Sequence, residues 1–213
     1  MCGNGFNDIT IVEVEKDIET SKKGGFGCAA CRILPCDEAS LDAAAELLNS
    51  GGVAVIPTDT VYGLAAHPSF PDAVARLYSI KGREIGKKIA LLASGANAVE
   101  EFGFPLSPAA KDLAERHWPG ALTMVLGDEG FRVPAHDWTR KLLAKCGGVL
   151  RVTSANLSGG SPATDAPQAL ADVGLSADMV MDDGESPGGV ASTVVRVCAG
   201  GEIEVLRKGA IAI

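Results

Sequence analysis

The densest group of cations in this sequence lies in the segment 81–88, which reads Lys-Gly-Arg-Glu-Ile-Gly-Lys-Lys. Its four cations, Lys81, Arg83, Lys87 and Lys88, accompany a single carboxylate in a chain whose formal net charge is −8. The segment follows a predicted helix and precedes a predicted buried strand, a position at which α/β sheets bind anions. A phosphate-binding loop and a solvated cationic loop both fit this pattern.

Two polar segments follow apolar runs elsewhere in the chain. Residues 57–64 read Pro-Thr-Asp-Thr-Val-Tyr-Gly-Leu, and residues 153–160 read Thr-Ser-Ala-Asn-Leu-Ser-Gly-Gly. Their hydroxyl and amide groups can orient an amine or a hydroxyl of a ligand, and the glycines let backbone N–H groups face a phosphate. Either segment alone also fits a turn or a helix cap. Because Arg132 and Arg207 also flank predicted strands, we expect one shared site for an anionic ligand.

Two well-known catalytic motifs are absent from the sequence. The histidines, His67, His117 and His136, do not have HExxH spacing. Segment 82–88 is not a P-loop, because three residues separate its glycines instead of four and Lys88 stands where the motif needs Ser or Thr. Zincin metalloproteases and P-loop NTPases are therefore excluded.

Cysteine usage and the N-terminal residues predict a cytoplasmic protein with free thiols. The first residues have neither the basic nor the apolar region of a signal peptide, and no run approaches the ~18 apolar residues of a membrane span. Cys28, Cys31 and Cys36 have metal-like spacing, but they offer three ligands where a structural zinc needs four. We therefore predict no protein-bound metal. The net charge of −8 also argues against a broad nucleic-acid-binding surface.

The apolar pattern that must position these residues is typical of one α/β domain. Short apolar runs predict buried strands, and periodic segments opened by capping residues or proline predict helices. The expected strands cover residues 53–56, 89–93, 122–126, 149–153, 179–181, 193–197 and 203–207. The expected helices are capped or opened by Asp37 or Ser40, Pro71, Ser107, Asp137 and Asp165. We expect a mixed sheet flanked by helices over residues 35–213, after an N-terminal extension, residues 1–34, made of a strand at 9–14 and a loop.

Seven motifs occur in an order that resembles a known family. They are Ile-Pro-Thr-Asp-Thr-Val-Tyr-Gly-Leu at 56–64, Lys-Gly-Arg at 81–83, Trp-Pro-Gly-Ala-Leu-Thr at 118–123, Arg-Val-Pro-Ala-His at 132–136, Thr-Ser-Ala-Asn-Leu-Ser-Gly at 153–159, Ser-Thr-Val-Val at 192–195 and Leu-Arg-Lys-Gly at 206–209. Over about residues 37–211 the chain resembles the YrdC-like family of threonylcarbamoyl-AMP synthases, in its short, single-domain branch.

The resemblance implies a twisted mixed sheet with a concave, positively charged cavity. It also implies a nucleotidyltransferase that converts L-threonine, bicarbonate and ATP to threonylcarbamoyl-AMP and pyrophosphate, with Mg²⁺ carried by ATP. Partner proteins would use this product to modify the tRNA adenosine next to the anticodon, while this chain would bind tRNA weakly at most. Two alternatives stay open, an RNA-binding module with this fold and a catalytically weakened, nucleotide-binding regulator.

The resemblance further implies roles for single residues. The residues expected to bind ATP are Lys81, Arg83, Lys87, Thr123, Ser154, Asn156 and Arg207, and the first two of them are the expected catalytic residues. The residues expected to bind threonine or its carbamate are Thr60, Arg132 and Ser192. Arg132 would pair with a carboxylate through its guanidinium fork. The alternative for Arg132 is a surface ion pair with Asp128 or Glu129.

The sequence departs from the family's usual pattern at a few places. Leu92 stands where many members have a histidine. Ala191 and Arg196 stand where an acidic residue or proline and an aspartate are more usual. Only eight residues, 124–131, separate the Leu-Thr motif from Arg132. We expect a short loop there, with part of the cavity wall missing or rebuilt.

Overall fold

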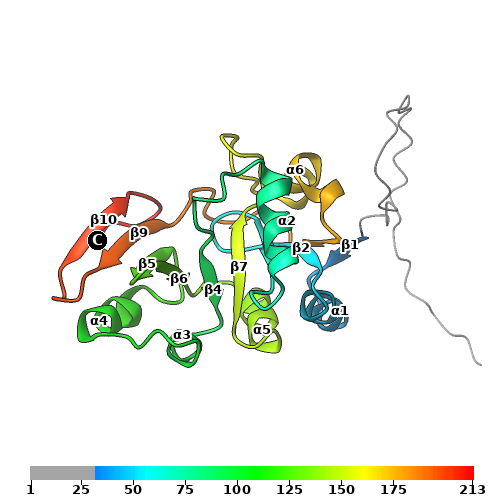
Figure 1. Cartoon of the computed structure of the whole chain (residues 1–213). Coiled ribbons are helices and arrows are strands. Elements are labelled where there is room, and N and C mark those ends of the chain that lie inside the picture. The colour runs from blue at the N-terminus through cyan, green and yellow to red at the C-terminus, as the bar shows by residue number, and fades with distance from the viewer. Residues whose placement is uncertain (1–31) are drawn as a thin grey trace, which may run out of the picture.

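The computed structural model describes residues 32–213, which form a β-sheet with helices packed on both sides of it (Figure 1). The expected strand at 9–14, Cys28 and Cys31 lie outside the described residues. The first strand, β1 (Arg32–Pro35), begins three residues before the domain start expected at residue 35. Within the described part of the chain, no helix has the length and apolar character needed to cross a membrane.

Four helices of residues 32–213 begin after a residue whose side chain caps the first turn. The helices of this part of the chain are α1 (Glu38–Asn49), α2 (Pro71–Lys81), α3 (Ala96–Glu101), α4 (Pro108–His117), α5 (Asp137–Lys145), α6 (Ala166–Asp172) and the 3-10 helix η1 (Gly174–Ser176). Asp37 and Ser40 form a reciprocal capping box at α1, where Oδ1 of Asp37 accepts a 2.8 Å hydrogen bond from the Ser40 N–H. Gly82 ends α2 with a φ of 58°, a left-handed conformation that favours glycine.

The predicted cap of α5 is wrong by one residue. Asp137 is the first residue of the helix, and His136 is its N-cap, with Nδ1 accepting a 3.2 Å hydrogen bond from the Thr139 N–H. A histidine ring nitrogen can accept a backbone hydrogen bond much as a carboxylate does, so the more usual cap at the next position was not needed.

The strands of the described residues form one mixed sheet in the order β1-β8-β2-β3-β7-β4-β6-β5-β9-β10. After β1 they are β2 (Val53–Ile56), β3 (Gly63–Ala66), β4 (Leu91–Ala93), β5 (Leu122–Leu126), β6 (Glu129–Arg132), β7 (Val149–Ser154), β8 (Met179–Asp182), β9 (Thr193–Val197) and β10 (Ile203–Arg207). Strand β8 is parallel to β1 and β2, whereas β3 is antiparallel to β2 and β7. The predicted single α/β domain with a mixed sheet is confirmed.

Five elements of the described residues are absent from the prediction: β1, β3, β6, α3 and the 3-10 helix η1. Strand β3 reads Gly-Leu-Ala-Ala, a composition with low β propensity, and it is a strand because it lies buried between β2 and β7. The short connection expected before Arg132 is a tight β-hairpin in which Leu126 pairs with Glu129, and the residues that follow its turn form β6. Gly127 permits this tight turn with a φ of 60°.

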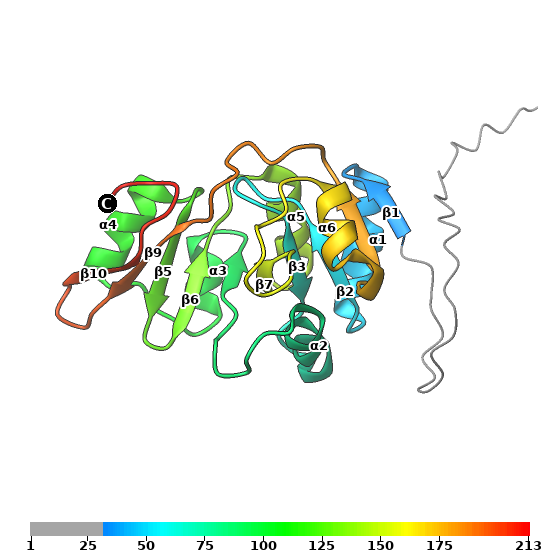
Figure 2. The same ribbon diagram turned by 90° about the horizontal axis from the view of Figure 1, so that it is seen from above.

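The helices cover the sheet in pairs. Strand β2 shows the alternation, because Ala54 and Ile56 pack on the side of α1 and α5 whereas Val53 and Val55 pack on the side of α2 and α6 (Figure 1). Helices α3 and α4 pack with β4, β5, β6 and β9 around the fully buried Phe131, in the other half of the molecule (Figure 2).

The register of the sheet brings the polar segments of the sequence together. Gly63, the first residue of β3, lies opposite Ile56 of β2 on one side and Ser154 of β7 on the other. The segment after β2 and the segment after β7 therefore leave the sheet at the same end of its strands. The backbone N–H of Ala155 donates to the Tyr62 carbonyl at 2.8 Å, which ties the two segments to each other.

Candidate active site

A polar cavity of about 240 Å³ lies between the end of α2 and the segment after β7. Its walls are Lys81, Gly82, Arg83, Glu84, Lys87, Ser154, Asn156, Ser158 and Gly159. Five of the seven residues expected to bind ATP line this one cavity, although they come from two stretches of sequence more than 60 residues apart. The cavity carries three cations and one carboxylate, a balance that suits an anionic ligand.

Lys81, the last residue of α2, is the most buried cation of this cavity, with 3 % of its surface exposed. Its Nζ donates to the carbonyl oxygens of Ser154 and Asn156, the latter at 2.5 Å. Burial lowers the pKa of Lys81 to about 8, with a further decrease from the nearby Arg83 and an opposing effect of Asp172. The ammonium group therefore joins the end of α2 to the segment after β7 at the wall of the cavity.

Arg83 and Lys87 belong to the loop that forms the opposite wall. The Arg83 side chain donates from Nε to the Lys87 carbonyl at 2.9 Å and from Nη2 to the Lys88 carbonyl at 3.1 Å. The loop backbone therefore bends back around this side chain. Lys87 is largely exposed and lies 3.1 Å from Glu84. A phosphate would compete with Glu84 for Lys87, because an exposed ion pair of this kind contributes little by itself.

The second group of expected site residues centres on Arg132, at the end of β6. The side chain of Arg132 is only 8 % exposed, and it donates from Nη1 to Oγ1 of Thr60 at 2.7 Å and from Nε to the Gly120 carbonyl at 2.9 Å. Its Nη2 lies 2.5 Å from Oδ1 of Asp59. Burial lowers the pKa of Arg132, and the Asp59 carboxylate opposes that effect.

Asp59 is the site residue that sequence reasoning missed. Its signal was present, since it directly precedes Thr60, an expected ligand-binding residue, and a buried arginine needs a carboxylate partner. The surface pair proposed as an alternative for Arg132 is wrong. Asp128 pairs with Lys88 instead, and Glu129 pairs with Arg151, each at 2.5 Å.

Three further site residues meet at Ser192, just before β9. The buried hydroxyls of Thr123 and Ser192 lie 2.8 Å apart. Arg207, at the end of β10, donates from Nη2 to the Ser192 carbonyl at 2.7 Å. Thr123 and Arg207 were expected on the nucleotide and Ser192 on threonine, yet their polar groups contact one another. Besides burial, the positive charge of Arg207 lowers the pKa of Arg132.

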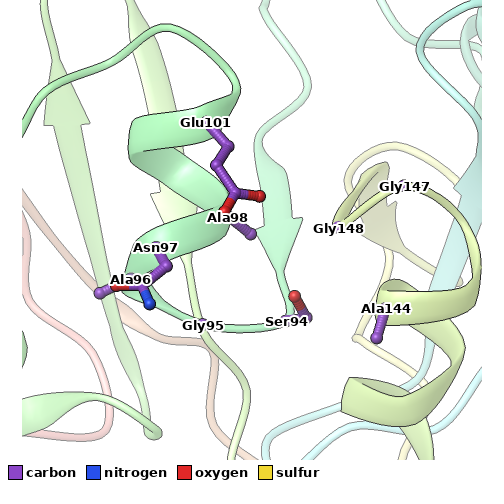
Figure 3. A pocket seen from close by; sticks show the side chains of 9 residues that line it. All are labelled: Ser94, Gly95, Ala96, Asn97, Ala98, Glu101, Ala144, Gly147 and Gly148. Carbon is purple, nitrogen blue, oxygen red and sulfur yellow. The ribbon is translucent and has the colours of Figure 1, made fainter.

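A larger hollow of about 620 Å³ lies away from these residues, between the start of α3 and the turn that joins α5 to β7 (Figure 3). It is lined by Ser94, Gly95, Ala96, Asn97, Ala98, Glu101, Ala144, Gly147 and Gly148. Its only charged lining residue is the acidic Glu101, so it suits a triphosphate poorly. None of the residues predicted from the sequence to form the site lines it.

The donor set of the site favours phosphate oxygens over a directly bound metal. Amine, guanidinium, amide and hydroxyl groups line the cavity, with Glu84 as the lone carboxylate. Across residues 32–213, no group of three or more His, Cys, Asp or Glu side chains is arranged to hold a metal ion. Cys36, Cys146 and Cys198 are free thiols in this part of the chain, and burial raises the pKa of Cys146 to about 11.

The part of the chain that carries the site is similar to known proteins. The model of the Sua5/YciO/YrdC family, described as "Telomere recombination", matches residues 46–209. The Bacillus subtilis protein named threonylcarbamoyl-AMP synthase is 33 % identical over 193 residues, which cover 84 % of this chain and 56 % of that protein. The Nitrosococcus oceani protein of the same name is 30 % identical over 162 residues, which cover 70 % of this chain and 88 % of that protein.

Solved structures of the family share the fold described above. The structure of Pyrococcus abyssi Sua5 complexed with L-threonine has a TM-score of 0.76 and 29 % identity, over 83 % of this chain and 57 % of that chain. Escherichia coli YciO, at 21 % identity, shares the fold with a TM-score of 0.75 over 84 % of this chain and 96 % of that one. This chain thus spans just over half of the Bacillus and Pyrococcus proteins. From the family match over residues 46–209, the chain belongs to the Sua5/YciO/YrdC family.

Proposed function

We propose that this protein is a nucleotidyltransferase that makes threonylcarbamoyl-AMP and pyrophosphate from L-threonine, bicarbonate and ATP. One observation carries the proposal: the segment after β7 lines the cavity of Lys81, Arg83 and Lys87, and it is hydrogen-bonded to the 57–64 segment. Thr60 of that second segment accepts a hydrogen bond from the buried Arg132. The first group suits a triphosphate, and the second suits a small hydroxy amino acid. The relatives named threonylcarbamoyl-AMP synthase support the same reading.

The proposed reaction needs alignment and charge neutralisation more than a protein nucleophile. The threonine amine captures the carbon of bicarbonate as a carbamate, with loss of water. A carbamate oxygen then attacks the α-phosphorus of ATP, a P–O bond forms, and the bond from that phosphorus to the bridging oxygen breaks to release pyrophosphate. Both partners are anions, so their approach is unfavourable unless cations surround the phosphates.

Lys81, Arg83 and Lys87 would supply that positive charge. Lys81 is held by the carbonyls of Ser154 and Asn156, so a phosphate oxygen would meet an ammonium group that is already oriented. The magnesium ion would enter with ATP as part of the substrate, bound by phosphate oxygens, because the lining residues offer few carboxylates. Its chemistry would be to neutralise charge on the triphosphate.

Threonine would bind beside Thr60, Arg132 and Ser192. Arg132 has five N–H donors, and three of them already bind Thr60, Asp59 and Gly120. Two remain without a partner among the described residues, which is the number that a carboxylate accepts from a guanidinium fork. The solved structure of Pyrococcus abyssi Sua5 with L-threonine supports a threonine site in this fold.

The product would serve partner proteins that modify the tRNA adenosine next to the anticodon. A chain with a net charge of −8 would bind the tRNA itself weakly, through a local patch at most. The cytoplasmic location expected from the sequence stays a prediction.

Pyrophosphate release from ATP tests the proposal directly. The purified protein should release pyrophosphate when threonine, bicarbonate and MgATP are all supplied, and omission of threonine or removal of bicarbonate should abolish release. Mass spectrometry should detect threonylcarbamoyl-AMP in the complete mixture. Equal release without threonine would overturn the proposal, and so would tight, salt-resistant tRNA binding in a protein without turnover, which would favour the RNA-binding module.

A further inference from the structure

The connection from β8 to β9, residues 183–192, links the two parts of the proposed threonine site, and we call it the strap. Figure 2 shows the strap in orange, crossing from the side of α6 to β9. Ser192 is its last residue, and its middle lies against the segment that carries Asp59 and Thr60. The strap therefore touches both groups that would have to close around threonine.

Gly188 makes the closest contact of the strap with this segment. A Cβ atom at Gly188 would lie 2.6 Å from the Asp59 carbonyl oxygen and 3.1 Å from the Thr60 Cα. Real Cβ atoms do not approach backbone this closely, so one of the two chains would have to move. The φ of Gly188 lies outside the left-handed region, whereas that of Gly189 is 60°. Glycine is needed at position 188 for the contact and not for the backbone conformation.

Ser186 fixes the strap two residues earlier. Its buried hydroxyl donates to the Thr58 carbonyl at 3.0 Å, and its backbone N–H donates to the Thr164 carbonyl at 2.7 Å. Thr58 in turn lies 3.1 Å from Thr60 through their hydroxyl oxygens. The strap thus contacts three consecutive residues, from Thr58 to Thr60, and it does so through backbone groups and one short side chain.

The far end of the strap is equally restrained. Arg207 and the Ser192 carbonyl are hydrogen-bonded, and the backbone N–H of Ala210 donates to the Ala191 carbonyl at 3.0 Å. Gly209 lies so close to Ser192 that a Cβ at position 209 would overlap its backbone. Because both ends of the strap are restrained, we expect a Cβ at position 188 to displace Asp59 and Thr60 relative to Ser192.

We propose that Gly188 is a positioning residue for threonine: its backbone contact with Asp59 and Thr60 sets the distance from Thr60 and Arg132 to Ser192. This inference rests on the proposed function, because threonine is the ligand that would span these side chains. Gly188 has no group that could touch the reacting atoms. Its effect is confined to the threonine side, since it does not line the cavity of Lys81.

Two variants test the inference against a matched glycine control. Gly188→Ala should raise the threonine Kd about tenfold or more, because a misplacement of about 1 Å can weaken a fitted site by that much. Ser186→Ala loosens the same strap without a clash and should raise it about threefold. Gly200→Ala is the control, since its added Cβ would meet nothing within 4 Å and its φ is open to any residue. Calorimetry should give wild-type ATP affinity for all three.

The outcomes separate this inference from the proposed function. If wild-type protein neither binds threonine nor releases pyrophosphate, the proposed function fails. If wild-type protein is active and both strap variants bind threonine as tightly as Gly200→Ala, the positioning role is overturned. It is also overturned if ATP and threonine affinities fall together, which indicates general damage. If circular dichroism shows that Gly188→Ala does not fold, Ser186→Ala alone decides the question by the same criteria.

Discussion

Asp59 and Arg132 form a buried ion pair that joins the β2–β3 connection to the end of β6, with Oδ1 of Asp59 2.5 Å from Nη2 of Arg132. The two residues are 73 positions apart in the sequence. Burial disfavours the charge on the guanidinium, and the carboxylate compensates for that penalty. Asp59 therefore offsets the cost of burying the charge of Arg132, and it fixes the orientation of the guanidinium group.

Removing the charge of Asp59 should destabilise the fold. Asp59→Asn leaves the buried guanidinium of Arg132 without a counter-ion, and a loss of about 3–5 kcal/mol in the free energy of unfolding is expected. Urea denaturation measures it. Asp128→Asn is the control, because the Asp128 pair with Lys88 is exposed. Equal stability of the two variants would contradict the compensating role of Asp59.

The geometry of the fork should matter more than its charge. Arg132→Lys keeps the positive charge but cannot bind Asp59, Thr60 and a substrate carboxylate together. We expect the threonine KM to rise about tenfold, equivalent to roughly 1.4 kcal/mol, with little change in ATP affinity. Arg116→Lys, in an exposed pair with Asp112, serves as the control. Loss of ATP affinity with an unchanged threonine KM would assign Arg132 to the nucleotide.

ATP binding should weaken as the pH rises through about 8. Burial lowers the pKa of Lys81 to that value, so its ammonium group loses its proton, and its attraction for phosphate, in this range. Calorimetry from about pH 7 to 9.5 should show a rising ATP Kd in the wild type and a flat, higher Kd in Lys81→Met. Lys111→Met, remote from the cavity, should retain the wild-type profile. A profile in Lys81→Met that follows the wild type would exclude Lys81 as the titrating group.

Thr123 offers a test of how the two ligands divide the site. Its hydroxyl lies 2.8 Å from that of Ser192, so Thr123→Val, which keeps the shape and removes the hydroxyl, should affect threonine. A rise in the threonine KM of about threefold to tenfold is expected, with ATP affinity retained. A loss of ATP affinity alone would instead assign Thr123 to the nucleotide, as the family resemblance implies.

Tyr62 should contribute to stability through its hydroxyl group. That group donates to the Gly184 carbonyl at 2.7 Å and accepts a 3.1 Å hydrogen bond from the Asp183 N–H, at the start of the strap. Tyr62→Phe should lower the free energy of unfolding by about 1–2 kcal/mol, because both backbone groups lose their partner. Tyr78→Phe is the matched control, since no hydrogen bond joins its hydroxyl to the described residues. Indistinguishable denaturation midpoints would rule out this contribution.

Sequence alone predicted the elements whose signals are local. Asp37 and Ser40 cap α1, and Pro71 opens α2, which Gly82 ends. Each of these residues acts on the backbone within one helical turn of itself, so the helix bounds follow from them. The cations of segment 81–88 and the polar segment after β7 were likewise identified as parts of one site. The structure brings them to one cavity, while their assignment to ATP remains a prediction.

Tertiary structure determined the features that depend on contacts between residues distant in the sequence. Strand β3 has little β propensity and is a strand because β2 and β7 enclose it. The partner of Arg132 is Asp59 and not a nearer acid, because the sheet brings the β2–β3 connection to the end of β6, and burial there requires a counter-ion. The need for glycine at position 188 arises the same way: it comes from a backbone more than 120 residues away that leaves no room for a Cβ. Contacts of this kind carry no local signal in the sequence.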